Sequence, residues 1–278
     1  MENYEEVFKN HNGFVSNKWV HYFYIYDRLF SEYRAKNQPL TIMEIGVDRG
    51  GSLEIWKKYL PENSKIHGVD INPKCGEINF SENIFFHLGS ASDRAFMEKT
   101  FADIDFDIII DDGSHICSDV IEAFKIMFPK IKNGGLYVVE DLHTSYWAVC
   151  GGGVLKKGSS IEYFKKFVEN INADYIYPFN FLNVFTKYFS RDFRGKVKRI
   201  LQKNANKKYF NGIEYSKLIE SITFYDSICA VKKFSRPKDV PFKSVINGDE
   251  NIDSEICFND EIEFIQKVRD MFVWGGGG

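Results

Sequence analysis

The 278 residues of this chain are enough for one large domain with additions, or for one domain and a small appendage. The chain is 44% hydrophobic and rich in Phe and Tyr, so it can build a sizeable core, and its net charge of −3 carries no nucleic-acid signature. No run of about 18 apolar residues occurs, so we expect no membrane-spanning helix, and the acidic N-terminus does not resemble a signal peptide.

The five cysteines are odd in number, widely spaced and without a C-x-x-C pair. This usage favours reduced thiols in a cytoplasmic protein and argues against a structural zinc site. The sequence thus predicts a cytoplasmic protein held together by its hydrophobic core.

An amphipathic helix is predicted over residues 17–36, where aromatic side chains recur at helical spacing. We interpret this stripe as core packing. The alternative is that Trp19, His21 or Tyr22 also lines a ligand pocket. Contacts between subunits of a homo-oligomer are a further use for these aromatic side chains that spacing does not distinguish.

Strands and helices then alternate along the chain. The predicted strands are Thr41–Val47, Lys65–Ile71, Ile84–Ser90, the start of Phe106–His115, and Leu136–Val139. The predicted helices are Leu53–Leu60, Asp93–Phe101 and Ser118–Ile131, the last ended by Asn133-Gly134-Gly135. Such an alternation predicts an α/β fold with right-handed βαβ units on a mostly parallel sheet.

The sequence changes character after Trp147. A helix is predicted over Ser160–Tyr175, a β-hairpin over Ser221–Phe234, and a helix near Glu261–Phe272 in an acidic tail. We therefore divide the chain into an N-terminal helical segment (1–38), a main domain (39–234) with a helical insertion at about 150–217, and an acidic C-terminal extension (235–278).

The segment 187–208 carries nine Lys or Arg residues against the single acid Asp192. The ordinary interpretation is a solvated helix face. The functional one is attraction of an anionic acceptor, such as a phosphorylated sugar, a nucleotide-sugar or an acidic glycan. RNA is a less favoured partner, because the run lacks interleaved stacking aromatic residues near the active segment Phe106–His115.

The segment Phe106–His115 reads F-D-I-I-I-D-D-G-S-H and dominates the interpretation. Its three consecutive isoleucines indicate a strand buried on both faces, and four polar side chains follow around Gly113. The strand Leu136–Val139 ends similarly, in Glu140-Asp141. Because ligands bind beyond the carboxyl ends of parallel strands, we expect these carboxylates and His115 at one sheet edge, provided that the two strands are neighbours. A merely solvated acidic loop is the alternative.

The turn Glu44-x-Gly46-x-Asp48-x-Gly50-Gly51 follows the first strand and opens a helix. Its glycines would let a ligand approach the backbone, but it departs from G-x-G-x-x-G, and Asp48 suits a pyrophosphate poorly. A ligand with its own positive charge, such as a sulfonium with an α-ammonium group, suits it better. Asp70 is placed to accept ribose hydroxyls and Ser90 to lie beside an adenine, so we predict a nucleoside-containing cofactor. Otherwise these two residues merely cap loops.

These residues resemble the class I S-adenosylmethionine (SAM)-dependent methyltransferases, and the hairpin matches that family's antiparallel sixth and seventh strands. The resemblance is carried by E-I-G-V-D-R-G-G-S, G-V-D-I, I-I-D-D-G-S-H and G-G-L-Y-V-V-E-D, in that order. Within the class, D-D-G-S-H, V-V-E-D-L-H-T-S-Y-W and the N-terminal N-K-W-V-H-Y resemble the metal-dependent sugar O-methyltransferases of macrolide biosynthesis, the mycinamicin 2''-O-methyltransferase type.

The resemblance implies a Rossmann-like, seven-stranded, mostly parallel sheet with an antiparallel C-terminal hairpin and helices on both faces. It implies Mg²⁺ (or Mn²⁺) ligands at Asp112, Glu140 and Asp141 and a catalytic base at His115. The cofactor-binding set that we predict comprises Glu44, Gly46, Asp48, Ser52, Asp70, Ile71, Ser90 and Asp111. The family usually has a bulky residue where this chain has His143, which is either a second pocket histidine or an ordinary substitution.

The resulting hypothesis is a SAM-dependent, magnesium-assisted O-methyltransferase for a sugar hydroxyl in polysaccharide or secondary-metabolite biosynthesis. The metal would acidify vicinal hydroxyls and His115 would take the proton. A cephalosporin-hydroxylase-like enzyme, another small-molecule methyltransferase and a non-enzymatic SAM-binding scaffold are the alternatives. An NAD-dependent oxidoreductase is disfavoured by the missing G-x-G-x-x-G.

Overall fold

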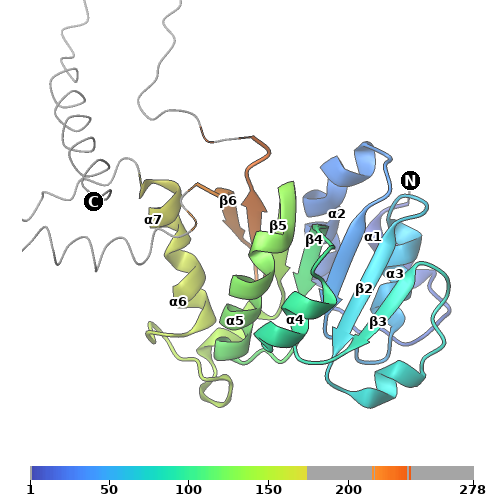
Figure 1. The fold of residues 1–278 in the computed structure, drawn as a ribbon, viewed down its shortest axis with the longest axis horizontal. Helices are drawn as coiled ribbons and strands as arrows, with labels where there is room; N and C mark the ends of the chain where they lie inside the picture. Colours follow the sequence, from blue (N-terminus) through green and yellow to red (C-terminus); the bar gives the residue numbers. More distant parts are fainter. Residues whose placement is uncertain (1, 174–214, 216, 237, 239–278) are drawn as a thin grey trace, which may run out of the picture. The chain divides into compact units, whose positions relative to one another are not determined.

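The computed structural model describes residues 2–173, 215, 217–236 and 238 (Figure 1). The chain divides into two compact units, residues 1–171 with 215–237 and residues 172–214 with 238–278. The basic segment 187–208 and the acidic extension with its predicted helix lie outside the described residues, apart from Ser235, Arg236 and Lys238.

Seven strands form one sheet in the described part of the chain, in the order β3-β2-β1-β4-β5-β7-β6. They are β1 (Thr41–Ile45), β2 (Lys65–Asp70), β3 (Ile84–Leu88), β4 (Phe106–Asp111), β5 (Ile131–Val139), β6 (Ile219–Phe224) and β7 (Cys229–Lys233). The first five strands pair in parallel, whereas β7 is antiparallel to β5 and to β6. The predicted mostly parallel sheet with an antiparallel hairpin is confirmed.

Helices cover both faces of the sheet (Figure 1). On one face lie α1 (Tyr4–Lys9), α2 (Val20–Ala35) and α3 (Gly51–Tyr59), and on the other α4 (Arg94–Thr100), α5 (Cys117–Met127), α6 (Ser160–Lys165) and α7 (Phe167–Ile171). Short 3₁₀ turns are η1 (Pro73–Glu77), η2 (Phe128–Lys130), η3 (Leu142–Tyr146) and η4 (Ala148–Cys150).

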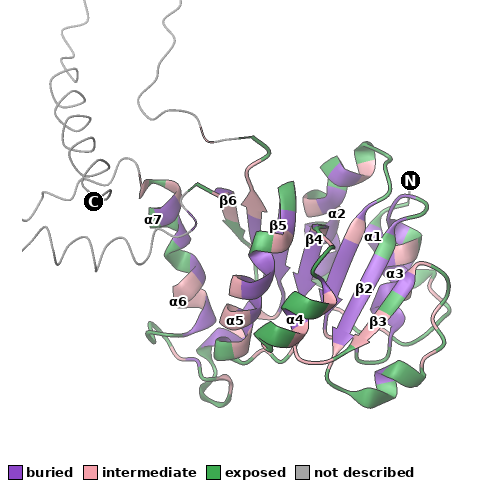
Figure 2. Ribbon diagram, viewed as in Figure 1, coloured by how far each residue is buried: buried purple, intermediate pink, exposed green. Residues whose placement is uncertain are grey.

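Each face of the sheet has its own hydrophobic core. Successive side chains of a strand point to opposite faces, so Ile108 and Ile110 of β4 join the core under α1, α2 and α3, while Ile109 joins the core under α4, α5, α6 and α7. All three isoleucines are fully buried, and the central strands are the most buried part of the fold (Figure 2). The uninterrupted apolar run therefore reflects burial on both faces, as predicted.

Three local predictions differ from the structure. The helix after His115 ends at Met127 instead of continuing to Ile131, because Pro129 has no N–H to donate and its ring obstructs a further helical turn. Residues 133–135 consequently lie within β5 and do not end a helix. The predicted helix 160–175 is two short helices, since the N–H of Lys166 bonds to the carbonyls of Tyr163 and Phe164 and not to the carbonyl four residues earlier.

The short helix α1 has no counterpart in the predictions. Asn3 caps it, accepting a hydrogen bond from the N–H of Glu6 at 2.8 Å, while the Glu6 side chain accepts from the N–H of Asn3 at 3.0 Å. Tyr4 of this helix is fully buried against Tyr26 of α2 and Trp56 of α3. Tertiary packing of aromatic rings thus holds a helix too short to be stable alone.

Candidate functional site

The carboxyl ends of β1, β4 and β5 meet at one edge of the sheet. Asp111 of β4 stands in register with Ile45 of β1 and with Val139 of β5. The N–H of Asp112 donates to the Ile45 carbonyl and the N–H of Glu140 to the Asp111 carbonyl, both at 2.9 Å. The fourth and fifth strands are therefore neighbours, which is the condition on which the predicted acidic site depends.

A cavity of about 480 Å³ opens at this edge, bordered by the ends of β1, β2, β3 and β4. Its lining includes seven of the eight residues predicted to bind a cofactor, namely Gly46, Asp48, Ser52, Asp70, Ile71, Ser90 and Asp111. The eighth, Glu44, is fully buried and does not line the cavity. The N-terminal segment Val15–Lys18, which no motif had placed here, forms part of the wall.

Asp70 at the end of β2 is held by main-chain donors. One carboxylate oxygen accepts from the N–H of Val47 at 2.8 Å and of Asp48 at 3.2 Å, and the other accepts from the N–H of Asn72 at 2.8 Å. A carboxylate oxygen has more than one acceptor site, so the fixed side chain can still receive hydroxyl groups from a ligand. Its position agrees with the ribose-binding role predicted for it.

The glycines of the turn after β1 serve backbone packing more than ligand approach. Gly46 has φ +91°, and a Cβ there would collide with the carbonyl oxygen of Asp112. A Cβ on Gly51 would collide with the carbonyls of Phe14 and Val15, and the N–H of Gly51 donates to the Val15 carbonyl at 3.2 Å. These two glycines therefore bring β4 and the N-terminal segment against the start of α3.

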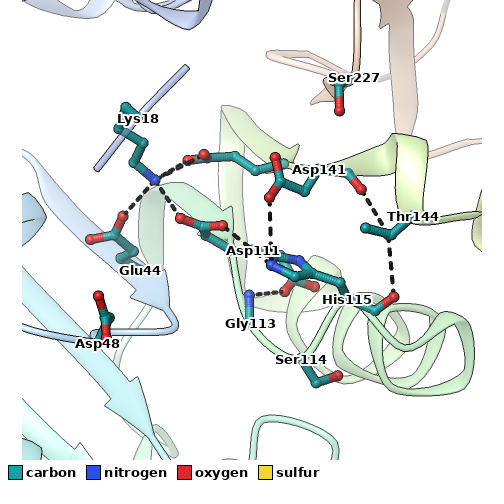
Figure 3. A network of polar contacts seen from close by, with 12 residues as sticks. Lys18, Glu44, Asp48, Asp111, Gly113, Ser114, His115, Asp141, Thr144 and Ser227 are labelled. Carbon is teal, nitrogen blue, oxygen red and sulfur yellow. Dashed lines mark hydrogen bonds and ion pairs between the residues drawn. The ribbon is translucent and has the colours of Figure 1, made fainter. Parts of the chain in front are cut away.

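Lys18 lies at the centre of the acidic edge (Figure 3). Its Nζ donates to both carboxylate oxygens of Glu140 at 2.8 Å and to Asp112, and it lies 3.5 Å from Oε1 of Glu44. The Lys18 side chain is only 3% exposed. The hydroxyl of Tyr26, from α2, also donates to Glu140. A buried ammonium group surrounded by three carboxylates thus organises the inner half of the site.

The charges of this cluster shift one another's protonation. Burial alone would lower the pKa of Lys18, but the carboxylates of Glu140, Asp112 and Glu44 raise it well above its ordinary value. Burial raises the pKa of Glu44, against the opposing effect of Lys18. Burial and the charge of Asp112 raise the pKa of Glu140. The buried acids therefore depend on Lys18 for a compensating charge.

His115 and Asp141 form the outer half of the site. The His115 Nε2 lies 3.6 Å from Oδ2 of Asp141 and 4.0 Å from Oδ1 of Asp112 (Figure 3). Oδ1 of Asp141 accepts a hydrogen bond from the Tyr22 hydroxyl at 2.6 Å. His115 and Asp141 both have positive φ, 57° and 50°, a conformation that costs energy outside glycine and recurs at functional sites.

The carboxylates can hold a metal ion in two overlapping groups. Ligand atoms of Asp112, His115 and Asp141 lie within 4.8 Å of one another, and so do those of Glu44, Asp112 and Glu140. The predicted ligands Glu140 and Asp141 thus fall into different groups, each with Asp112. Oxygen donors dominate both sets, which fits a hard divalent cation such as Mg²⁺ and not Zn²⁺.

Three aromatic rings border this edge. The ring of His143 makes edge-to-face contacts with Trp19, at 6.1 Å between centroids, and with Trp147, at 4.9 Å. Nδ1 of His143 lies 2.6 Å from the Ser227 hydroxyl oxygen. Trp19 and Trp147 are 56% and 52% exposed, which is unusual for large rings beside a polar site.

Sequence reasoning missed Lys18 and Tyr26 as site residues. Lysines are usually solvated and a tyrosine in an aromatic stripe is usually core, so neither residue type gives a signal by itself. The N-K-W-V-H-Y segment was noted only as part of a resemblance. Tyr22 had been considered as a pocket residue, and its hydroxyl does reach Asp141.

Comparison with known proteins agrees with this geometry. Residues 43–142 match a family model described as a methyltransferase domain. The 8-demethyl-8-(2-methoxy-alpha-L-rhamnosyl)-tetracenomycin-C 3'-O-methyltransferase of Streptomyces olivaceus is 34% identical over 174 residues, covering 58% of this chain and 43% of that protein. The mycinamicin VI 2''-O-methyltransferase of Micromonospora griseorubida is 40% identical over 135 residues, covering 46% and 33%.

Solved structures give the same result for the fold. The MycE methyltransferase of mycinamycin biosynthesis, in complex with Mg and SAH, is similar with a TM-score of 0.61 at 28% identity, over 78% of this chain and 50% of that one. The complex that also contains mycinamycin VI gives 0.62 at 26%, over 84% and 54%. The chain spans less than half the length of these two curated relatives.

In the described part of the chain no helix is both long and apolar enough to cross a membrane. Family, sheet topology and the strand-end residues agree with one another. Residues 43–142 match a methyltransferase-domain model, and the predicted resemblance of the chain to the sugar O-methyltransferases of macrolide biosynthesis is confirmed.

Proposed function

We propose that the protein is a SAM-dependent, Mg²⁺-assisted O-methyltransferase that acts on a sugar hydroxyl. The observation that carries the proposal is the position of His115, between the carboxylates of Asp112 and Asp141 and in the wall of the cavity. A base, a cation site and a nucleoside-sized cavity therefore adjoin one another, as an oxygen methyl transfer requires.

The cavity suits SAM in size and in polarity. Asp70 is fixed for a ribose, Ser90 lines the wall beyond β3, and Asp48 supplies a negative charge where the ligand carries a sulfonium or an ammonium group. When bound, SAM supplies an activated methyl group, and the chain has to align the acceptor with it. Fixed walls on several strands favour such alignment, which accounts for much of the rate acceleration in a displacement reaction.

Asp112 and Asp141, with Glu140, are the residues that would hold the divalent cation. A cation beside the acceptor oxygen would lower the pKa of its hydroxyl group. His115 Nε2 would then take the proton as the oxygen gains the methyl group, acting as the general base. Asp141 would orient the imidazole and stabilise its protonated form.

The acceptor class follows from the aromatic rim and from the relatives. Trp19 is next to Lys18 in the chain and His143 is two residues past Asp141, so the exposed rings of Trp19 and Trp147 adjoin the catalytic edge. Pyranose rings present C–H groups that pack on such aromatic faces. We infer a sugar acceptor, either on a secondary metabolite or in a polysaccharide, and either free or linked to a phosphate or nucleotide.

The proposal is tested by incubating the protein with methyl-labelled SAM, Mg²⁺ and a panel of glycosides, sugar phosphates and nucleotide-sugars. Transfer of label that depends on protein, Mg²⁺ and one acceptor class supports it. SAM binding without transfer to any sugar, phenol or amine would favour a binding scaffold instead. Failure to bind SAM or S-adenosylhomocysteine at all would refute it.

A further inference from the structure

The N-terminal segment before α2 reaches the site through one buried side chain. Its residues Val15–Lys18 line the cavity, and the Lys18 ammonium group extends to the acidic edge. There it contacts Asp112, Glu140 and Glu44, while the Lys18 side chain is 3% exposed. One residue thus belongs to the wall of the cavity and to the cluster that would hold a cation.

The buried acids have few other partners. Neither carboxylate oxygen of Glu44 makes a hydrogen bond of normal geometry within the described residues, although the side chains of Ser52 and Trp56 lie close enough to lower its pKa. The ammonium group that pairs with Glu44 is that of Lys18. Glu140 has Lys18 and the Tyr26 hydroxyl. Removing one partner of a buried ion pair leaves an uncompensated charge, so the cluster holds Lys18 firmly in place.

Other polar contacts in the described part of the chain hold the same segment near its start. The N–H of Phe14 donates to Glu54 at 2.9 Å, and the Val15 carbonyl accepts from Gly51. Between Val15 and α2, the charged contacts of Lys18 are the strongest tie to the sheet. The position of the cavity wall therefore depends on the acidic cluster.

We propose that Lys18 is a positioning residue that couples the two ligand sites: it holds the wall of the cofactor cavity closed while opposing cation binding at Asp112 and Glu140. The inference rests on the proposed function and adds to it a link between the two sites. An ammonium group that occupies the same carboxylates as a cation repels that cation and competes for its ligands. The same ammonium group keeps Val15–Lys18 in the wall of the cavity, which favours binding of the cofactor and not of the cation.

Replacing Lys18 by Met should therefore move the two affinities in opposite directions. The dissociation constant of S-adenosylhomocysteine, measured by calorimetry, should rise roughly tenfold, and that of Mn²⁺, measured by electron paramagnetic resonance of the free ion, should fall roughly tenfold. S-adenosylhomocysteine is preferred to SAM because it lacks the sulfonium charge. A lysine with a merely structural role would weaken both ligands together.

Two further variants complete the design. Lys9→Met removes an exposed lysine of the same N-terminal region that pairs only with Glu5, and both dissociation constants should stay at the wild-type values. If Lys18→Met does not fold, Lys18→Met with Glu44→Gln removes a buried acid together with its partner. Compared with Glu44→Gln alone, that double variant should show the same opposite shifts.

The outcomes separate the inference from the proposed function. Wild-type protein that binds neither S-adenosylhomocysteine nor Mn²⁺ would refute the proposed function, and the inference with it. Wild-type protein that binds both, with Lys18 variants that are folded by circular dichroism but unchanged or weakened for both ligands, would overturn the inference alone.

Discussion

The imidazole of His115 and the carboxylate of Asp141 face each other across the ends of β4 and β5, with Nε2 3.6 Å from Oδ2. Each residue sits in the left-handed region of the backbone, so the strand ends are bent specifically to bring them together. A carboxylate at this distance orients an imidazole and stabilises its protonated form, as a general base requires.

His115→Ala should lower kcat by about 10²–10⁴, the usual contribution of a general base. The affinity for S-adenosylhomocysteine should change far less than kcat, although His115 is one of the many residues that line the cavity. His143→Ala provides the control, since this imidazole is held by Ser227; its effect should appear in KM for the acceptor. Wild-type kcat in His115→Ala would remove this residue from the mechanism.

Chelation with EDTA should abolish turnover, and Mg²⁺ or Mn²⁺ should restore it, because hard oxygen donors dominate the site. Asp112→Asn should weaken Mn²⁺ binding the most, since Asp112 belongs to both candidate ligand groups. Asp103→Asn, at an exposed position outside the site, is the matched control. Full activity in EDTA would refute the requirement for a metal.

Trp147→Ala should raise KM for a sugar acceptor about three- to tenfold while leaving kcat and the affinity for S-adenosylhomocysteine near their wild-type values. Loss of stacking on one exposed ring costs about 0.5–1.5 kcal/mol, which corresponds to that range. Tyr24→Ala tests the effect of deleting an equally exposed ring elsewhere, on α2. An unchanged KM for every acceptor would place the sugar outside the aromatic rim.

Gly51→Ala should destabilise the fold by about 1–3 kcal/mol and weaken S-adenosylhomocysteine binding, because a Cβ there meets the carbonyls of Phe14 and Val15. Gly76→Ala should be milder, since its Cβ would meet only the Phe86 ring at 3.3 Å. Chemical denaturation and calorimetry measure the two effects. Equal free energies of unfolding in both variants would mean that the N-terminal segment shifts away from the added Cβ without a cost in stability.

Lowering the pH should destabilise the protein through His67, a buried residue of β2, the strand that lies between β1 and β3. Burial, then the neighbouring His87 and Lys65, lowers the pKa of His67 from 6.5 to about 4. As the pH falls, the unfolded chain therefore binds the proton at a higher pH than the folded chain does. The contribution of neutral His67 to the free energy of unfolding is complete above pH 6.5 and is lost as the pH falls from 6.5 to about 4.

The loss in the free energy of unfolding should be on the order of 2 kcal/mol, allowing for partial solvation of His67 and His87. His67→Gln should flatten this part of the stability curve, whereas His21→Gln, at an exposed position on α2, should not. Denaturant unfolding at a series of pH values measures both. Parallel curves for wild type and His67→Gln would contradict the assignment.

The fold was largely predictable because its signals are local. The isoleucines of β4 and the turn residues after β1 follow from periodicity and glycine chemistry, and the seven-stranded sheet with its antiparallel hairpin followed from the family resemblance. One failure was local, because Pro129 ended a helix earlier than the apolar pattern indicated. The other was not, because α1 is held by the packing of Tyr4 on Tyr26 and Trp56, a tertiary contact that no window of sequence contains.

The site residues that follow directly after a strand could be predicted from the sequence. Those that come from a distant segment of the chain could not. Asp112, His115 and Asp141 follow strands and could be placed at one edge from topology alone. Lys18 lies 94 residues from Asp112 and 122 from Glu140, so its role depends on a meeting that only the folded chain reveals. Glu44, which was predicted to bind the cofactor, is buried beside Lys18 and does not line the cavity. The sequence gives no sign of this contact with Lys18.

The contact between Gly51 and Val15 also brings residues outside the family match to the cavity. The family match starts at residue 43, yet the wall and the ammonium group of the site come from residues 15–18. A protein trimmed to residues 43–142 would lose β6 and β7 from the sheet and residues 15–18 from the wall of the cavity. The residues that line the cavity therefore extend further toward the N-terminus than the residues that match the family model.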